Sequence, residues 1–225
     1  MNFSRFYHVW LQHLQLLLEQ LAASPKPITN EDQHYTIQLI SRVMSHYDDY
    51  YRVKTHAAKN DVFSMFSASW LTSLEQSLNW IAGWRPTTIF HLVYTESSAC
   101  FEARLLDLLQ GNRTGDLGDL SPAQLARVSE LQCETVRKEN EITTELGSWQ
   151  ESACDIVSLL LDQEPEVERL VKVLEKADDL RLKTIKSVVE VLTPQQAVEF
   201  LIAAAELQFG VRGWGLAIDQ RRGNT

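Results

Sequence analysis

The stretch LNWIAGWRPTTIFHLVY, residues 78–94, joins a Gly-to-Pro hinge to a dense set of aromatic side chains. Gly83 is typical of the left-handed residue that ends a helix. Pro86 is typical of the first turn of the next helix, where its missing N–H is not needed. The segment therefore predicts two helices joined by a short turn, and the apolar stripe of the first helix is Trp70, Leu74, Leu78 and Ile81.

Outward from this hinge, apolar residues follow the helical period in both directions. An N-terminal helix is expected to end before the SPKP sequence at 24–27, and a second is expected from about Glu31 to Ala58. A long helix and a further helix after Glu164-Pro165 are expected in the C-terminal half. Their apolar stripes are Leu125, Val128, Leu131, Thr135, Ile142, Leu146 and Trp149, then Leu170, Val173, Leu174, Ala177, Leu180, Thr184 and Val188.

Two helix starts carry a capping-box pattern, in which a hydroxyl residue is followed three positions later by Gln. They are Ser121 with Gln124, and Thr193 with Gln196. The segment AVEFLIAAAELQF, 197–209, continues the last of these helices. We expect that helix to end at the glycines that follow, Gly210, Gly213 and Gly215.

Helical patterns fill the chain, and no alternating set of strands with hairpin turns is present. We therefore predict an all-α fold, a single multi-helix bundle with long antiparallel helices that spans residues 1–225 as one domain. The Gly-rich segment at about 111–120 is expected to be a flexible loop. The near-heptad stripe from Leu125 to Trp149 fits packing within the monomer and across a homodimer equally well.

The composition is that of an ordinary globular chain, with 44% hydrophobic and 23% charged residues. A net charge of −9 provides no general attraction to nucleic acid, so direct nucleic-acid binding is not expected. No apolar run approaches the roughly 20 residues of a membrane span, and no signal-peptide pattern begins the sequence. Three cysteines without a CxxC pair favour a reducing nucleus or cytoplasm.

Motifs of phosphate-binding loops, dinucleotide sites, hydrolase elbows and zinc proteases do not occur, so no catalytic residue and no metal site is predicted. His46 and His56 lie too far apart along one helix to share a metal ion. Neighbouring carboxylates such as Asp178 and Asp179 point apart on a helix, and we interpret them as part of a solvated face.

The aromatic residues of the hinge allow two interpretations. At helical spacing they are core residues. Alternatively they line an apolar pocket, because indole N–H and phenol O–H groups need polar partners that a ligand or protein can supply. The residues of this candidate pocket are Trp70, Trp80, Trp84, Phe90 and Tyr94.

Four blocks of the sequence together resemble the plant delay-of-germination domain, which the C-terminal halves of TGA bZIP transcription factors share. The blocks lie at 46–66, 70–94, 118–132 and 175–208. The most specific element is W-x9-W-x-x-G-x-R-P, formed by Trp70, Trp80, Gly83, Arg85 and Pro86. Because the first residues already resemble the domain, we expect a stand-alone member of the family rather than a TGA factor.

The resemblance implies a non-enzymatic regulator that acts through protein–protein interaction. Seed dormancy and germination, abscisic acid signalling and transcription regulation through partners are the expected processes, with pollen aperture formation as an alternative. Protein phosphatases of the abscisic acid pathway are the implied partners, self-association is common, and the nucleus and/or cytoplasm is the expected location.

An N-terminal aromatic segment is implicated in phosphatase contact in this family. Phe6, Tyr7, Trp10 and Leu14 lie at the comparable place and are our candidate partner-binding residues, although Trp10 fits the core equally well.

Haem binding in the family depends on histidines in the last helical block, where this chain has Gln208 and Arg212. Haem ligation there is therefore not expected, and no cofactor is predicted. An apolar ligand such as a fatty acid is the alternative that the TGA relatives imply, which would make the chain a small-molecule binding module.

Overall fold

The computed structural model describes residues 3–24, 29–112, 114–153 and 164–223, and these residues form helices and no strand. This confirms the predicted all-α class. The elements are α1 Phe3–Ala22, α2 Asn30–Asn60, α3 Val62–Ser67, α4 Ser73–Ser77, α5 Thr88–Ala103, α6 Leu105–Leu109, the 3-10 turn η1 Leu117–Asp119, α7 Pro122–Ala153, α9 Glu164–Val191 and α10 Pro194–Arg222.

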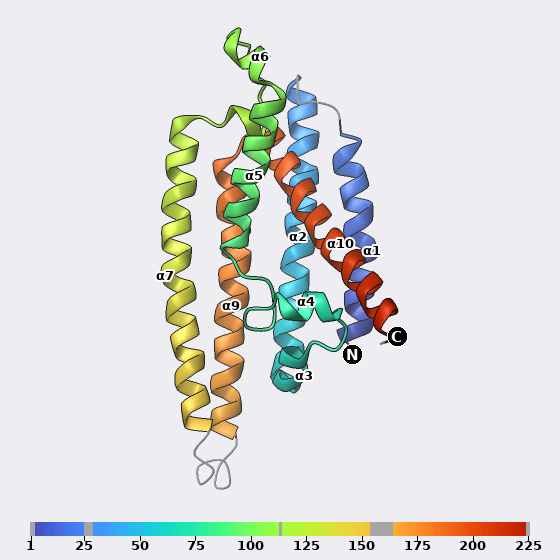
Figure 1. The fold of residues 1–225 in the computed structure, drawn as a ribbon, viewed down its shortest axis with the longest axis vertical. Coiled ribbons are helices and arrows are strands. Elements are labelled where there is room, and N and C mark those ends of the chain that lie inside the picture. Colours follow the sequence, from blue (N-terminus) through green and yellow to red (C-terminus); the bar gives the residue numbers. More distant parts are fainter. Residues whose placement is uncertain (1–2, 25–28, 113, 154–163, 224–225) are drawn as a thin grey trace.

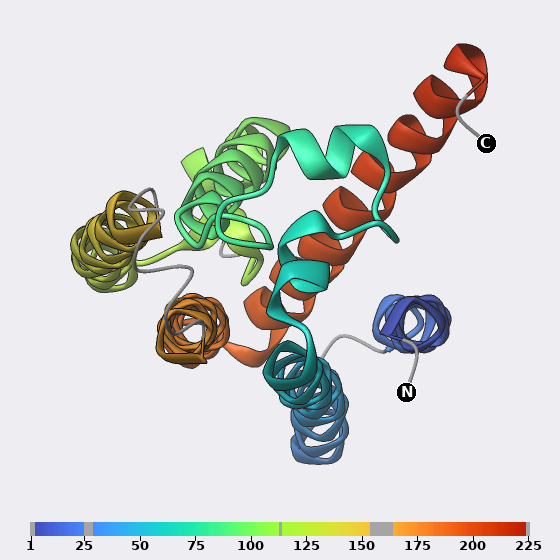
Figure 2. The same ribbon diagram turned by 90° about the horizontal axis from the view of Figure 1, so that it is seen from below.

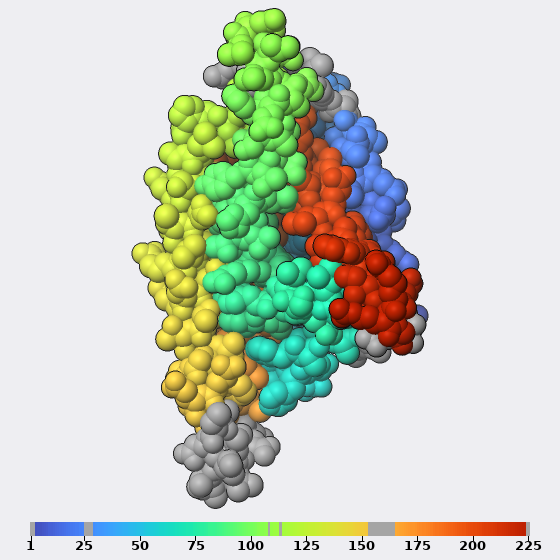
Figure 3. All heavy atoms as spheres, viewed as in Figure 1, coloured from blue at the N-terminus to red at the C-terminus, as the bar shows by residue number. Residues whose placement is uncertain are grey.

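The long helices form an antiparallel bundle (Figure 1). Helix α9 packs against α7 on one side and α2 on the other, and α1 packs on α2 (Figure 2). Helix α10 crosses the bundle obliquely and contacts α1, α2, α4 and α5. The space-filling view shows α5 and α10 side by side on one face, with α6 projecting at the end of the molecule (Figure 3).

The near-heptad stripe of α7 packs within the monomer, because its central residues are buried against α9. Val128, Leu131, Thr135 and Ile142 are the buried members.

Both capping boxes are confirmed. Ser121 N–H donates to Gln124 Oε1 at 3.0 Å, and Thr193 is capped by Gln196 in the same way.

Helix α1 is fixed to α2 by two reciprocal ring-to-backbone hydrogen bonds. Trp10 Nε1 donates to the His46 carbonyl at 3.0 Å, and His46 Nε2 donates to the Trp10 carbonyl at 2.9 Å. The two rings stack 4.9 Å apart. Burial lowers the pKa of His46, and the hydrogen bond to the Trp10 carbonyl opposes this shift.

The predicted end of the last helix at Gly210, Gly213 and Gly215 is wrong. Helix α10 continues to Arg222, and the left-handed residue that ends it is Gly223, with φ of 71°. None of the three earlier glycines has a positive φ, so they are ordinary helical residues. A glycine in a helix is permitted at a modest cost, and these three do not stop it.

The segment at 111–120, predicted as a flexible loop, contains a buried residue that attaches it to α10. The Leu117 side chain is buried, and its N–H donates to Glu199 Oε2 of α10 at 2.9 Å. Gly118 lies against the backbone of Cys100 and Phe101, where a Cβ atom would be within 2.8 Å of main-chain atoms. The absence of a side chain at Gly118 therefore lets η1 pack directly on α5.

Four tyrosines of α1 and α2 make a testable prediction for alkaline pH; Tyr7, Tyr47 and Tyr51 are buried, and Tyr50 is partly buried. Burial raises the pKa of Tyr7 to about 12 and raises the pKa values of Tyr47, Tyr50 and Tyr51. Tyrosines of the unfolded chain ionise near their ordinary pKa of about 10. Above that pH the unfolded state therefore holds fewer protons than the folded state, and stability falls as pH rises.

We expect absorbance at 295 nm to report these four phenolates only as the helical circular dichroism is lost, in one transition above pH 10. Independent ionisation of all four while the protein stays helical would contradict the buried arrangement.

Candidate functional site

The hinge segment is a loop wrapped around buried charges. The helix predicted up to Gly83 is limited to α4, and the chain from Asn79 to Thr87 runs as an open loop. Ile81 and Ala82 both adopt left-handed backbone angles, with φ of 46° and 55°. This conformation is unfavourable, above all for β-branched Ile81, so neighbouring structure must hold it.

Arg181 of α9 holds the loop through its carbonyl groups. Its Nε donates to the Trp84 carbonyl at 2.7 Å, and one terminal nitrogen donates to the carbonyls of Trp80 and Ile81, the latter at 2.9 Å. Its other terminal nitrogen donates to Asp178 Oδ1 at 2.5 Å. The guanidinium also lies over the Trp80 ring, 5.3 Å from its centroid.

Lys54 of α2 completes this arrangement, which we call the buried ion cluster, Lys54–Asp178–Arg181. Its Nζ donates to the Ala82 carbonyl at 2.7 Å and to Asp178 Oδ1 at 2.9 Å. Asp178 is therefore buried, and the interpretation of Asp178 as part of a solvated face is wrong. Periodicity on α9 could not reveal this, because a carboxylate is buried only when distant cations reach it.

The cluster brings two cations and one carboxylate out of water. Burial lowers the pKa of Lys54 to about 8, an effect that Arg181 reinforces and Asp178 opposes. The carbonyl oxygens of the loop accept the other hydrogen bonds that Lys54 and Arg181 donate. Among the described residues, Asp178 Oδ2 is buried without a hydrogen-bond partner. The Nε and terminal nitrogens of Arg181 are all used within the fold, so the cluster joins α2, α9 and the loop.

Gly83 has a different role from the one predicted. Its φ is not positive, and a Cβ atom there would lie 2.8 Å from Cζ of Arg181. The glycine is needed because the guanidinium approaches the backbone closely. The helix stop expected at Gly83 is therefore wrong.

The rest of the hinge is fixed by Glu139 of α7, whose side chain is buried. Arg85 Nε donates to its Oε2 at 2.8 Å, and Thr87 N–H donates to its Oε1 at 2.7 Å. Helix α5 begins at Thr88, two residues after Pro86, so Pro86 lies in the turn before the helix and not in its first turn. Glu139 thereby joins the start of α5 to α7.

The polar groups of the five candidate pocket residues are mostly paired within the fold. Three of their polar groups are paired within the fold: Trp80 Nε1 with Thr143 at 3.1 Å, Trp84 Nε1 with Tyr51 at 3.1 Å, and Tyr94 Oη with Gln132 at 3.2 Å. Trp70 packs edge-on to Phe3, and its Nε1 lacks a hydrogen-bond partner among the described residues. Phe90 is fully buried and borders a cavity of only about 20 Å³.

The candidate partner-binding residues of α1 face the core. Tyr7, Trp10 and Leu14 are buried, and Phe6 is partly buried against the same core. The exposed apolar residues of α1 are instead Val9 and Leu16. A partner that reaches this helix would therefore contact its outer face.

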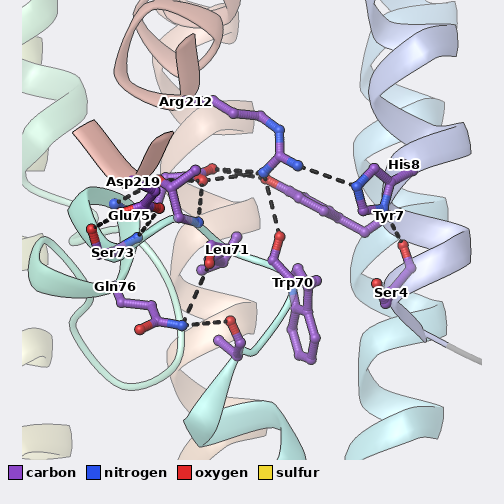
Figure 4. Close-up of polar contacts among 12 residues, drawn as sticks. Ser4, Tyr7, His8, Trp70, Leu71, Ser73, Glu75, Gln76, Arg212 and Asp219 are labelled. Atoms are coloured by element: carbon purple, nitrogen blue, oxygen red, sulfur yellow. Dashed lines mark hydrogen bonds and ion pairs between the residues drawn. The ribbon is translucent and has the colours of Figure 1, made fainter. Parts of the chain in front are cut away.

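Arg212 takes part in a polar network between α1, α4 and α10 (Figure 4). It pairs with Glu75 at 3.1 Å, contacts His8 Nε2 at 3.3 Å and lies over the Tyr7 ring. Asp219 accepts hydrogen bonds from Ser73 N–H, at 3.0 Å, and from the Ser73 hydroxyl. Arg212 occupies a position where haem-binding relatives are expected to carry a histidine, and it connects α10 to α4. Gln208, at the other such position, lies one helical turn earlier on the same side of α10.

A surface that the sequence analysis missed lies at the end formed by α5 and α6, and we call it the α6 surface. Leu106 and Leu109 are 75% and 74% exposed. An open groove of about 320 Å³ at the C-terminal end of α5 is bordered by Phe101, Leu120 and Leu125. The signal was the apolar run at 105–109, which is too short and too apolar for an ordinary solvated helix.

The described residues contain no group of three or more His, Cys, Asp or Glu residues that could hold a metal ion. None of the helices described is long and apolar enough to cross a membrane.

Removing the carboxylate of the buried ion cluster should strongly destabilise the fold. In Asp178→Ala two buried cations lose their counter-charge, and we expect a loss of about 3–5 kcal/mol in the free energy of unfolding. The matched control is Asp48→Ala, which breaks the half-exposed pair with Lys186 at 2.7 Å. That loss should stay within about 1 kcal/mol in the same urea titration. Equal effects would contradict a structural role for the cluster.

Adding one methyl group at Gly83 should also destabilise the protein. The Gly83→Ala Cβ would displace Arg181 from its carbonyl partners, and we expect a loss of about 1–3 kcal/mol in urea denaturation. Gly147→Ala is the control, because no described atom lies within 4 Å of a Cβ there. It should stabilise α7 by about 0.5–1 kcal/mol. The same sign for both variants would argue against close approach at Gly83.

Comparison with known proteins identifies the family to which this sequence is similar. The sequence model of a family described as DOG1, seed dormancy control, matches residues 13–95. Protein DOG1-like 4 of Arabidopsis thaliana is 33% identical over 95% of this chain and 92% of its own length. Protein RESPONSE TO ABA AND SALT 1 of Arabidopsis thaliana is 28% identical over 94% of both chains.

A more distant match is the transcription factor TGA6 of Arabidopsis thaliana, which is 26% identical over 73% of this chain and 49% of its own length. The order of likeness, with a DOG1-like protein ahead of a TGA factor, confirms the resemblance seen in the hinge and its flanking blocks. The chain belongs to the DOG1 family.

Proposed function

We propose that this protein is a non-enzymatic plant regulatory protein that acts by binding other proteins. Its family model is described as seed dormancy control, and one relative is named for its response to abscisic acid and salt. These names support a role in dormancy and abscisic acid signalling, exerted in the nucleus or cytoplasm and on transcription through partners.

The observation that carries the proposal is the α6 surface. Two neighbouring leucine side chains that are three-quarters exposed form an apolar patch, and such patches often mark interaction sites. The ionised groups of the hinge, by contrast, are consumed in holding helices together. Exposed apolar area is available for docking, which is the basis of most protein association.

A protein phosphatase of the abscisic acid pathway is the partner we propose for the α6 surface. The surface carries Glu102 and Asp107 with a single described arginine, Arg104, and the chain as a whole has a net charge of −9. The complementary surface on the phosphatase should therefore be an apolar groove edged by basic residues. The rim charges should make association faster at low ionic strength.

The outer face of α1 is the competing contact, because the family resemblance implicates this segment. Val9 and Leu16 provide its exposed apolar area, 43% and 54% exposed, on a helix otherwise buried through Tyr7 and Trp10. A binding loss in Trp10→Ala would not identify this surface, because that change also removes the hydrogen bond to His46. Matched surface variants are therefore required.

We expect Leu106→Ser/Leu109→Ser to weaken binding to a purified phosphatase catalytic domain by at least about tenfold, since burying an exposed leucine side chain contributes about 1.5–3 kcal/mol. The control Val9→Ser/Leu16→Ser removes two exposed apolar side chains from α1 and should leave the affinity unchanged. Isothermal titration calorimetry gives the affinities, and circular dichroism checks that both variants stay folded. A loss only in the α1 variant would move the contact to α1, and no binding by wild type would refute this partner.

An apolar ligand remains the alternative function. The groove at the C-terminal end of α5 has enough volume for a small ligand, and Phe101, Leu120 and Leu125 give it apolar walls. Native mass spectrometry of the purified protein tests this alternative, since a retained ligand adds mass to the 25.7 kDa chain.

A further inference from the structure

A small hollow between α7 and α9 is bordered by two lysines, Lys138 of α7 and Lys183 of α9. The two helices lie side by side along their length (Figure 1). Buried side chains of Phe90, Leu131 and Leu180 form the apolar part of its wall. We call this site the α7–α9 hollow. Within the described residues, neither lysine forms an ion pair with a carboxylate.

The absence of such ion pairs is unexpected on this chain, because 30 acidic residues face 21 lysines and arginines. Glu134 precedes Lys138 by four positions and Asp179 precedes Lys183 by four, a spacing that favours ion pairs on a helix. Among the described atoms, however, the cation that Glu134 faces is Arg127, at 3.8 Å. Burial and then neighbouring carboxylates raise the pKa of Asp179, as for a carboxyl group that no cation stabilises.

The two lysines instead act on each other. Burial and then the charge of Lys183 lower the pKa of Lys138, and Glu134 opposes this shift. Two ammonium groups that share one hollow repel each other, and an anion placed between them would turn that repulsion into attraction. The hollow therefore has the charge of an anion site.

Hydroxyl groups add to the donors of the hollow. Thr135 and Ser187 border it, and neither hydroxyl has a hydrogen-bond partner among the described residues. Two hydroxyls and two ammonium groups are therefore available to one ligand, and all four donate hydrogen bonds. A ligand whose oxygens only accept them, such as a tetrahedral oxyanion, matches this set.

The size of the hollow fixes how such an anion lies. Its volume of about 20 Å³ accommodates one water-sized group. One oxygen of the anion therefore enters, and the other oxygens stay at the mouth. Lys183 is exposed, so its ammonium group is available to the oxygens on the solvent side.

We propose that the α7–α9 hollow binds a phosphate group, with one oxygen between Thr135 and Ser187 and the charge shared by Lys138 and Lys183. Hydrogen bonds from ammonium groups to phosphate oxygens are charge-assisted and strong. Inorganic phosphate and a phosphate monoester share this chemistry, since the ester oxygen lies at the mouth. None of these residues belongs to the α6 surface, so the site does not depend on the partner proposed there.

Phosphorus-31 NMR of inorganic phosphate titrated with the full chain tests the site, because bound phosphate broadens the signal. Lys138→Gln and Lys183→Gln should each weaken binding by about tenfold, the effect of losing one charge-assisted hydrogen bond. Lys172→Gln is the matched control. It removes another exposed lysine of α9, about three turns before Lys183 and outside the hollow, and should leave the affinity unchanged.

A gain of binding separates this site from general charge effects on structure. Glu134→Gln removes the one acidic side chain that borders the hollow, so phosphate should bind more tightly to this variant. Without phosphate, Lys183→Gln should leave the thermal midpoint unchanged or raise it, because it relieves the repulsion with Lys138. A lower midpoint would mean that Lys183 forms ion pairs within the fold, and it would overturn the proposal.

The source of the phosphate group is decided by titrating O-phosphoserine in parallel with inorganic phosphate. Tighter binding of phosphoserine assigns the site to a phosphate monoester, and tighter binding of inorganic phosphate assigns it to the free ion. No broadening by the wild-type chain, or equal weakening in Lys172→Gln and Lys183→Gln, would refute a phosphate site between α7 and α9.

Discussion

The guanidinium of Arg181, held out of water against the backbone of residues 80–84, is the interaction on which the rest of the hinge depends. It turns the carbonyls of Trp80, Ile81 and Trp84 inward, and Lys54 does the same for Ala82. The left-handed angles of Ile81 and Ala82 follow from this requirement, because carbonyls that face a buried cation cannot continue a helix. Gly83 follows too, since the same guanidinium occupies the space of its side chain.

Sequence periodicity predicted the long helices because their stability comes from a continuous apolar face, which is a local pattern. The capping boxes at Ser121 and Thr193 were predictable for the same reason, since donor and acceptor lie three residues apart. The roles of the glycines were not predictable, because the sequence does not distinguish a glycine that permits the close approach of another group from one that permits a positive φ. Asp178 was missed because its local pairing with Arg181 would fit an exposed helix face equally well, and the second cation, Lys54, lies 124 residues away.

The candidate site residues divide along a similar line. Aromatic residues of the hinge and of α1 were recognised as important, yet the fold uses Tyr7, Trp10 and Phe90 for packing. The surfaces left over are apolar residues that periodicity could not distinguish from core, namely Leu106 and Leu109 on α6 and Trp214 on α10. What separates them is whether another helix of the same chain covers them, which depends on tertiary arrangement.

The long reach of the buried ion cluster has a consequence for how this chain matures during synthesis. The carbonyl groups of the loop bind Arg181, which lies 100 residues after Ile81 in the sequence. During synthesis the loop is therefore made well before its partner. Until α9 leaves the ribosome, Arg181 is not present to offset the unfavourable backbone at Ile81 and Ala82. The hinge conformation therefore forms late, when α9 packs against the earlier helices. A chain truncated before α9 would contain the hinge sequence but would not adopt the hinge conformation.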